Sequence, residues 1–232
     1  VHNLLEALNG ARGKLKKTRV VVQGFGNAGS NMAKMLADAG FLVVGVSDSK
    51  GGLYCEGGIL PYDAISCKRT TGSVGGCVVA GIEYAAKEGA ACKKVTNEQL
   101  LELPCDVLAL SAFENQLTKK NAAKVKAKIV LELANGPTTP EADEILKKKG
   151  VMVIPDILAN SGGVTVSYFE MVQNASNYYW SAEEVQEKLK RLMVAAWKAV
   201  ESTSKKHHCT LREAAFIVGL KRLEEAMLVR GW

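Results

Sequence analysis

Apolar residues near the start of the chain form a short run, then a helical pattern, then a second short run. The first run, 20–22, consists of β-branched residues and predicts a buried parallel strand. Positions 27–38 carry apolar side chains at helical spacing, and they predict an amphipathic helix that Gly40 ends. The second run, 41–46, predicts another strand. A strand, a helix and a strand in this order are the repeating unit of a parallel sheet.

The same alternation continues through the middle of the chain. Apolar runs at 106–110, 128–133 and 151–154 predict three further strands, and polar helical stretches separate them. This pattern predicts an α/β fold of the doubly wound Rossmann type, with a mainly parallel sheet.

From residue 161 onward the strand signal disappears, and the remainder has helical periodicity. Ser181 with Glu184 three positions later is a capping box and predicts the start of a helix. We therefore expect two parts, a Rossmann-type domain in residues 1–180 and a C-terminal helical segment in residues 181–232.

Some stretches between these elements give weaker patterns. Residues 1–17 predict a lead-in helix, and 62–68 predict a short helix. Gly51 and Gly52 predict a turn that leads the chain away from the second strand. The stretch 70–91 mixes glycine with β-branched residues, so we expect a flexible excursion there.

Composition narrows the class of protein. With 232 residues, 47% of them hydrophobic and 23% charged, the chain is long enough to bury a large core. No apolar run approaches the roughly 20 residues of a membrane span. The net charge of +6 comes from lysines scattered without interleaved aromatic residues, so we expect no nucleic-acid partner and no membrane partner.

Cysteine usage bears on the cellular compartment. None of the six cysteines forms a C-x-x-C pair or another spacing typical of metal ligands, and an α/β chain of this size does not need disulfides. We therefore expect reduced thiols, no metal site and a cytoplasmic location. The cysteines are Cys55, Cys67, Cys77, Cys92, Cys105 and Cys209.

Three glycines between the first strand and the first long helix have the G-x-G-x-x-G spacing. Gly24 allows a tight turn, Gly26 allows a close approach of the backbone to a pyrophosphate, and Gly29 allows the helix to pack on the strand. The helix N-terminus supplies N–H groups and a positive dipole for phosphate. Asp48 follows the second strand, about 20 residues on, where a ribose-binding carboxylate is expected. Together these features predict a dinucleotide site.

A ligand of such a sheet lies at the carboxyl ends of the strands. The polar or glycine positions that fall at this edge are Gly24, Asp48, Ser111, Asn135 and Asp156. A local structural role remains open for some of them. Asn135 equally fits a brace for the following turn, and Asp156 and Asn160 equally fit helix caps.

Longer motifs carry a family resemblance. The segments GFGNAG, SDSKGG, ANGPTTPEAD, IPDILANSGGVTVSYFE and AMLVRGW resemble the coenzyme-binding half of glutamate dehydrogenases, closest to the archaeal members. The resemblance implies reversible oxidative deamination of L-glutamate to 2-oxoglutarate and ammonia, with hydride transfer to NAD or NADP. It also implies a homo-oligomer, usually a hexamer, for the full-length enzyme.

The family's catalytic lysine belongs to a preceding substrate domain, and its motif is absent from this sequence. The resemblance therefore implies no catalytic residue in this chain and no turnover by this chain alone. It further implies that the C-terminal helices pack back toward the substrate domain.

Position by position, the resemblance and the glycine spacing together imply two sets of contacts. The cofactor contacts are Gly24, Gly26, Asn27, Ala28, Gly29, Asp48, Ser49, Lys50, Ala112, Asn135 and Asn160. The first five belong to the pyrophosphate loop, the next three to the adenosine ribose, and the last three to the nicotinamide and its ribose. The substrate contacts are Gly163, Val164 and Ser167.

Two alternative functions remain open. One is a stand-alone module that binds a dinucleotide for regulation, and the other is the coenzyme half of a leucine, phenylalanine or valine dehydrogenase. Ser167 favours glutamate over the apolar substrates, because its hydroxyl can hydrogen-bond a carboxylate and has no partner on an apolar side chain.

The residues at the end of the second strand give opposing indications for NAD and NADP. Asp48 favours NAD because a carboxylate accepts ribose hydroxyls and repels a 2′-phosphate. Ser49 and Lys50 offer a hydroxyl and an ammonium that suit such a phosphate. We therefore predict use of both dinucleotides, with Lys50 as the discriminating residue.

Overall fold

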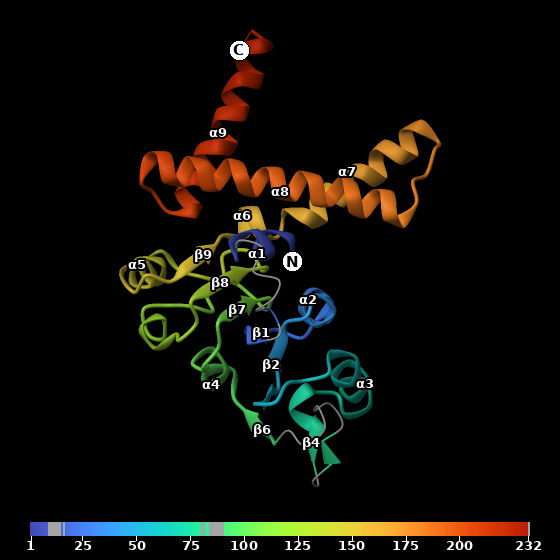
Figure 1. The fold of residues 1–232 in the computed structure, drawn as a ribbon, viewed down its shortest axis with the longest axis vertical. Coiled ribbons are helices and arrows are strands. Elements are labelled where there is room, and N and C mark those ends of the chain that lie inside the picture. The colour runs from blue at the N-terminus through green and yellow to red at the C-terminus, as the bar shows by residue number, and fades with distance from the viewer. Residues whose placement is uncertain (9–14, 16, 80–81, 84–90, 232) are drawn as a thin grey trace. The chain divides into compact units, whose positions relative to one another are not determined.

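The computed structural model describes residues 1–8, 15, 17–79, 82–83 and 91–231 (Figure 1). The chain divides into two compact units, and each is described by itself below. Unit 1 comes from Ala11–Val153 and contains the sheet, and unit 2 comes from His2–Gly10 and Ile154–Trp232 and is helical. The division at residue 181 that the sequence suggests stays a prediction.

Seven strands form the main sheet, in the order β6-β3-β2-β1-β7-β8-β9. The central pairs β1–β2, β1–β7 and β7–β8 are parallel, which confirms the predicted doubly wound, mainly parallel sheet. The strands are β1 (Arg19–Gln23), β2 (Leu42–Asp48), β3 (Gly51–Cys55), β6 (Cys92–Val95), β7 (Val107–Leu110), β8 (Ile129–Glu132) and β9 (Met152–Ile154).

Helices cover both faces of this sheet. Figure 1 shows α2 and α3 on one side and α4 and α5 on the other. Their bounds are α2 (Asn27–Asp38), α3 (Pro61–Thr71), α4 (Asn97–Leu101) and α5 (Pro140–Lys148), and a 3-10 turn, η3 (Ala122–Lys124), precedes β8. Local sequence explains two of these helix starts, since Thr96 forms a capping box with Gln99 and Thr139 caps α5 ahead of a proline.

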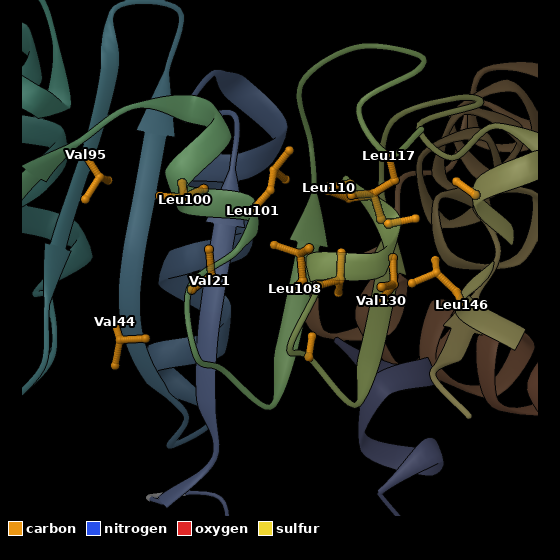
Figure 2. Close-up of a cluster of buried hydrophobic side chains, with 14 of the residues drawn as sticks. Val21, Val44, Val95, Leu100, Leu101, Leu108, Leu110, Leu117, Val130 and Leu146 are labelled. Atoms are coloured by element: carbon orange, nitrogen blue, oxygen red, sulfur yellow. The ribbon is translucent and has the colours of Figure 1, made fainter. Parts of the chain in front are cut away.

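One face of the sheet packs into a continuous apolar core (Figure 2). Val21, Leu108 and Val130 point from three adjacent parallel strands toward side chains of α4 and α5, among them Leu100 and Leu146. All five are fully buried. Because the central strands are covered on both faces, they are apolar at nearly every position.

The sheet extends beyond the parallel strands in a way that the sequence analysis missed. Gly51 and Gly52 do not lead the chain away from the sheet, because they begin β3, which pairs antiparallel with β2. A Cβ atom on Gly52 would lie 2.9 Å from the carbonyl oxygen of Val46. The glycine is therefore required by close strand packing, and the two residues between the strands suffice for the turn.

Part of the predicted flexible excursion is ordered. Helix α3 continues to Thr71 and ends at Gly72, whose φ of +77° is a left-handed conformation typical of a glycine helix cap. A 3-10 turn, η2 (Val74–Cys77), follows, and then the short pair β4 (Val78–Val79) and β5 (Ile82–Glu83). The prediction for 80–81 and 84–90 lies outside the described residues.

The expectation that all six cysteines are reduced is wrong. Cys55 is bonded to Cys92, and Cys67 is bonded to Cys77. The first pair faces across the antiparallel strands β3 and β6, with Cα atoms 4.2 Å apart. A separation of 37 residues gives no local signal, so this bridge becomes visible only once the strand pairing is known. Cys105 and Cys209 are free thiols.

Unit 2 is helical, as predicted for the last third of the chain. Its helices are α1 (His2–Ala7), α6 (Asp156–Ala159), α7 (Ser161–Ser176), α8 (Ala182–His207) and α9 (Leu211–Val229). Capping boxes begin α8 and α9, and Trp197 of α8 is buried. Asn3 of α1 donates a hydrogen bond to the carbonyl of Leu158. In the described part of the chain, no helix is both long and apolar enough to cross a membrane.

Candidate functional site

The glycine loop, residues 24–29, joins β1 to α2 and is shaped by two severe steric limits. Gly24 has a φ of +88°, and a Cβ atom there would lie 2.7 Å from the backbone of Ser111 and Ala112. A Cβ atom on Gly29 would lie 1.7 Å from the carbonyl oxygen of Gly24. Both positions therefore require glycine, the first for the turn and the second for close contact of the helix with the turn.

Gly26 differs from its two neighbours, because a Cβ atom there would meet no heavy atom within 4 Å. It is the N-cap of α2, and no side chain caps that helix. The first N–H groups of an α-helix have no partner within the helix. The loop thus leaves open space in front of polar donors and a positive helix dipole, which is the arrangement that holds a phosphate group.

Residues after β7 form one wall of this loop. The hydroxyl of Ser111 is buried, and within the described residues it has no hydrogen-bond partner. Its Cβ atom lies 3.1 Å from the position that a Gly29 Cβ would occupy. An unpaired buried hydroxyl beside an uncapped helix is a polar group available to a ligand. The structure therefore brings Gly24 and Ser111 together, as predicted for the carboxyl edge, and places Gly29 and Ala112 beside them.

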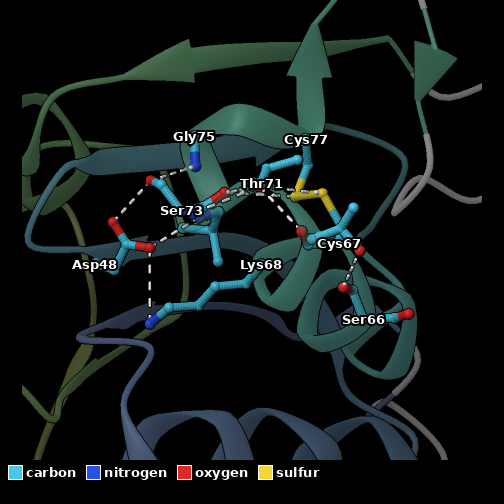
Figure 3. Close-up of a disulfide and its surroundings, with 10 residues drawn as sticks. Asp48, Ser66, Cys67, Lys68, Thr71, Ser73, Gly75 and Cys77 are labelled. Carbon is cyan, nitrogen blue, oxygen red and sulfur yellow. Dashed lines mark hydrogen bonds and ion pairs between the residues drawn. A yellow bond between two sulfur atoms is a disulfide. The ribbon is translucent and has the colours of Figure 1, made fainter.

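Asp48 ends β2 and is almost fully buried, with 8% of its surface exposed. Its Oδ1 atom accepts hydrogen bonds from the Lys50 backbone N–H and the Ser73 hydroxyl, both at 2.9 Å. Its Oδ2 atom accepts the Val74 backbone N–H at 2.8 Å and lies 3.7 Å from the Lys68 ammonium. We call Asp48, Lys68, Ser73 and Val74 the Asp48 cluster (Figure 3). The four donor groups occupy most of the positions at which the Asp48 carboxylate can accept a hydrogen bond.

Lys68 connects the Asp48 cluster to the glycine loop. Its ammonium donates a 2.8 Å hydrogen bond to the carbonyl of Phe25 while it faces Asp48. The sequence analysis missed Lys68 and Ser73, because they lie 20 and 25 residues beyond Asp48 and belong to no recognisable motif. Polar residues in and after the helix that follows β2 would have been the signal, since that helix returns to the same sheet edge.

The two residues after Asp48 lie at the surface. Ser49 and Lys50 are exposed, and they line a hollow of about 400 Å³ with Thr96 and Asn97. The Lys50 ammonium lies 3.5 Å from where a Cβ atom on Gly72 would stand. The backbone N–H of Lys50 donates to Asp48, and the Lys50 side chain is available to an external anion.

The predicted nicotinamide contacts lie on different parts of the chain. Ala112 is half-buried and follows β7, and Asn135 is exposed and follows β8. These two strand ends are adjacent, because Leu133 and Ala134 both donate to the carbonyl of Leu110. Their place at the carboxyl edge agrees with the prediction, whereas their contacts with a cofactor stay predicted.

The other predicted contacts belong to unit 2. Asn160 is the N-cap residue of α7, as the capping alternative has it, but its side chain makes no cap hydrogen bond there. Asp156 is the first residue of α6, where its carboxylate accepts from the Ile157 N–H and pairs with Arg212 at 3.4 Å. The capping role suggested for Asp156 is wrong, because Pro155 is the N-cap of α6, although the Asp156 carboxylate accepts an N–H of the first turn.

Three exposed residues of the first turns of α7 are the predicted substrate contacts. Val164 is 70% exposed, and Gly163 and Ser167 are also exposed. The Ser167 hydroxyl donates to the Gly163 carbonyl at 3.2 Å, four residues earlier in the helix. A hydroxyl on an exposed helix face is free to exchange this bond for an external acceptor.

In unit 1, Cys105 and Asp106 have shifted pKa values, and both lie at the amino end of β7, away from the carboxyl edge. Burial raises the pKa of the Cys105 thiol to about 12. Burial also raises the pKa of Asp106, but hydrogen bonds from the Arg19 N–H and the Lys128 ammonium outweigh it, so the net shift is downward. Cys105 is thus a protonated, half-buried thiol and not a nucleophile.

Comparison with known proteins identifies relatives along nearly the whole chain. The catabolic NAD-specific glutamate dehydrogenase RocG of Bacillus subtilis is 46% identical over 220 residues, which are 94% of this chain and 49% of that protein. The NAD-specific glutamate dehydrogenase of Staphylococcus aureus (strain COL) is 45% identical over 219 residues, covering 94% of this chain and 50% of that protein. The chain spans about half the length of these relatives.

Solved structures give the same match. The hetero-hexameric glutamate dehydrogenase of Thermus thermophilus, in a leucine-bound form, superposes with a TM-score of 0.86 at 34% identity, over 99% of this chain and 52% of that one. The glutamate dehydrogenase of Peptoniphilus asaccharolyticus gives a TM-score of 0.79 at 33% identity, over 100% of this chain and 52% of that one.

The family model for glutamate/leucine/phenylalanine/valine dehydrogenases matches residues 1–231. This match includes the glycine loop, the Asp48 cluster and the exposed turns of α7. The chain therefore belongs to the glutamate/leucine/phenylalanine/valine dehydrogenase family.

Proposed function

We propose that this chain is the coenzyme-binding part of an L-glutamate dehydrogenase that uses NAD or NADP. The observation that carries the proposal is the open space at Gly26 in front of the uncapped N-terminus of α2. The buried, unpaired hydroxyl of Ser111 supplies a further polar group beside the same loop. These features fit a dinucleotide, whose pyrophosphate needs N–H donors and a close backbone approach.

When bound, the nicotinamide ring supplies the hydride acceptor. The proposed task of this chain is to position that ring. The N–H groups of Asn27, Ala28 and Gly29 would hold the pyrophosphate, and Ala112 and Asn135 would border the nicotinamide end. Fixing both ends removes orientational freedom before the chemical step, which is a large source of rate enhancement.

The Asp48 cluster bears on the proposed use of both dinucleotides. A free carboxylate after β2 would repel a 2′-phosphate, but here the Lys68 ammonium lies 3.7 Å from Asp48 and offsets its charge. For Asp48 to accept ribose hydroxyls as well, one of its present donors must leave. The arrangement supports NADP use more than the sequence motif alone does, and Lys50 remains the proposed discriminating residue.

Glutamate is the proposed substrate, with Gly163, Val164 and Ser167 as its contacts on α7. The Ser167 hydroxyl is exposed and suits a carboxylate better than an apolar side chain. The relatives named for glutamate support this choice over leucine, phenylalanine or valine. A hexamer, as in the Thermus thermophilus protein, and a cytoplasmic location are likewise proposals for the protein that carries this chain.

The test uses the intact protein in two assays. Calorimetric titration with NADH and NADPH is expected to show saturable binding of both. Turnover assays are expected to favour L-glutamate over L-leucine, L-phenylalanine and L-valine by about 10⁴-fold or more, the range for a site built to hydrogen-bond its substrate. Absence of dinucleotide binding would refute the proposal. Preference for an apolar amino acid would favour the alternative substrate, and binding without turnover of any amino acid would favour the regulatory module.

A further inference from the structure

The disulfide between Cys67 and Cys77 encloses every group that the α3–η2 segment gives to Asp48 (Figure 3). Lys68, Ser73 and Val74 all lie among the nine residues between Cys67 and Cys77, which are 10 positions apart. Val74 is fully buried, but the interval also includes Gly72, Gly75 and Gly76, which have no side chain to pack. A covalent closure of a short, glycine-rich loop restricts it strongly.

The loop is also held by a chain of hydrogen bonds that begins at the disulfide. The hydroxyl of Thr71 donates to the carbonyls of Cys67 and Ser73, at 3.0 and 2.7 Å. The hydroxyl of Ser73 donates to Asp48 and accepts the N–H of Gly75 at 3.2 Å. These bonds connect Cys67, through Thr71, to the turn whose groups contact Asp48.

The two sulfurs differ in access. Cys67 lines a surface pocket of about 380 Å³ on α3, together with Asp63, Ser66, Thr70 and Thr71. Cys67 is 8% exposed, whereas Cys77 is 1% exposed and does not line this pocket. A thiolate from solvent can therefore reach Cys67 first, and Cys77 is the leaving group.

We propose that Cys67–Cys77 is a thiol–disulfide exchange site whose opening by a dithiol loosens the Asp48 cluster and weakens dinucleotide binding. This inference rests on the proposed coenzyme function of the glycine loop. Lys68 links the two, because the same ammonium contacts Asp48 and the Phe25 carbonyl within that loop. A site that must be ordered before it binds has a lower apparent affinity.

A dithiol would reduce Cys67–Cys77 in two exchange steps. One thiolate of the dithiol attacks the Cys67 sulfur, a mixed disulfide forms, and the Cys77 thiolate leaves and takes up a proton. The second thiol of the reagent, as thiolate, then attacks the reagent's own sulfur in the mixed disulfide and releases Cys67, which is protonated. The reagent ends as a cyclic disulfide, and the protein has gained two electrons and two protons.

The test begins with the intact protein purified without reductant and then treated with dithiothreitol. Alkylation and peptide mass spectrometry measure the opening of each disulfide, and hydrogen exchange measures the Val74 amide, which donates to Asp48. We expect Val74 exchange to accelerate on the order of tenfold when Cys67 and Cys77 become alkylated. We also expect the Kd for NADH to rise about fivefold or more, a typical lower value for linked sites.

A pair of double variants assigns the effect to this bridge. Cys55→Ala with Cys92→Ala removes the other disulfide and is expected to respond to dithiothreitol as the parent does. Cys67→Ala with Cys77→Ala is expected to show fast Val74 exchange and weak NADH binding with or without the reagent. If either double variant fails to fold, the proposal is still tested by comparing Val74 exchange and NADH affinity between the oxidised and the reduced parent protein.

The inference is overturned if Cys67 and Cys77 become alkylated in the folded protein while Val74 exchange and NADH affinity stay unchanged. It is also overturned if Cys67–Cys77 resists dithiothreitol until the protein unfolds. If neither redox state binds NADH or NADPH, the proposed coenzyme function fails, and with it the coupling. In that case, hydrogen exchange of the Val74 amide still tests whether reduction of Cys67–Cys77 loosens the Asp48 cluster.

Discussion

The glycine loop and the Asp48 cluster lie at the same sheet edge, yet they are constructed differently. In the loop, the shape is set mainly by backbone limits among six consecutive residues, such as the 1.7 Å separation that forbids a Cβ atom on Gly29, with Ser111 and Ala112 closing one side of Gly24. In the cluster, Asp48 is held by side chains and an amide from residues 20 to 26 positions away. One region therefore depends on local sterics and the other on tertiary contacts, and substitutions should affect them differently.

The largest effect is expected for Gly29→Ala. The added methyl group would overlap the Gly24 carbonyl, so the turn and α2 must separate, at a cost of about 3 kcal/mol in the free energy of unfolding. Chemical denaturation measures this loss. Gly219→Ala is the matched control, because that helical glycine has open space and alanine there is expected to stabilise α9 slightly. Equal stability of the two variants would remove the steric argument.

Gly26→Val should separate binding from folding. The side chain would enter the open space in front of α2, so stability is expected to stay within about 1 kcal/mol of the parent. Binding of NADH should weaken at least about 100-fold, because the backbone can no longer approach the pyrophosphate. Thermal denaturation and calorimetric titration of the same sample check both parts. A parental Kd in a normally folded variant would mean that Gly26 serves only the turn.

Asp48→Asn addresses the second region. The amide cannot accept from all four donors and loses the attraction of Lys68, so unfolding free energy should fall by about 2 kcal/mol, as for a lost charged hydrogen bond. Ser73→Ala removes one of the neutral donors and should lose about half as much. Denaturation curves of the two variants, compared with the parent, test this ranking. The reverse ranking would show that the carboxylate contributes little to the fold.

The smallest effect is expected for Lys50→Ala, because this side chain is exposed and only its backbone supports Asp48. We expect about fivefold weaker binding of NADPH and almost no change for NADH, if the ammonium contacts the 2′-phosphate. Lys148→Ala, which changes an exposed lysine in the last turn of α5, is the control and should leave both affinities unchanged. Equal losses for NADH and NADPH in the Lys50 variant would exclude it as the discriminating residue.

The contrast also explains what sequence analysis could and could not predict. The parallel strands, helix α2 and the roles of Gly24 and Gly29 follow from short-range patterns, since Gly24 adopts a positive φ in the turn and Gly29 lies against the Gly24 carbonyl. The contact of Gly24 with Ser111 and Ala112 is tertiary and has no such local pattern. The burial of Asp48 by Lys68 and Ser73 has no such local signal. A carboxylate after a strand looks the same in sequence whether it faces a ligand or the protein interior.

The two disulfides and β3 likewise have no local signal in the sequence. Cys55 and Cys92 become neighbours only because β3 turns back along β2 and then pairs with β6. Gly51 and Gly52 resemble turn residues in sequence, although their function is to permit close strand packing. These features depend on which segments pair, and a single sequence does not reveal that.

The most direct test of the proposed function is an experimental structure of the intact protein with NADH bound. We predict that the pyrophosphate oxygens lie within hydrogen-bond distance of the N–H groups of Asn27, Ala28 and Gly29, in the open space at Gly26. The Asp48 carboxylate should keep its bonds to Ser73 and Val74. A dinucleotide ordered elsewhere on the protein, or density for NADH with these N–H groups unengaged, would contradict the proposal.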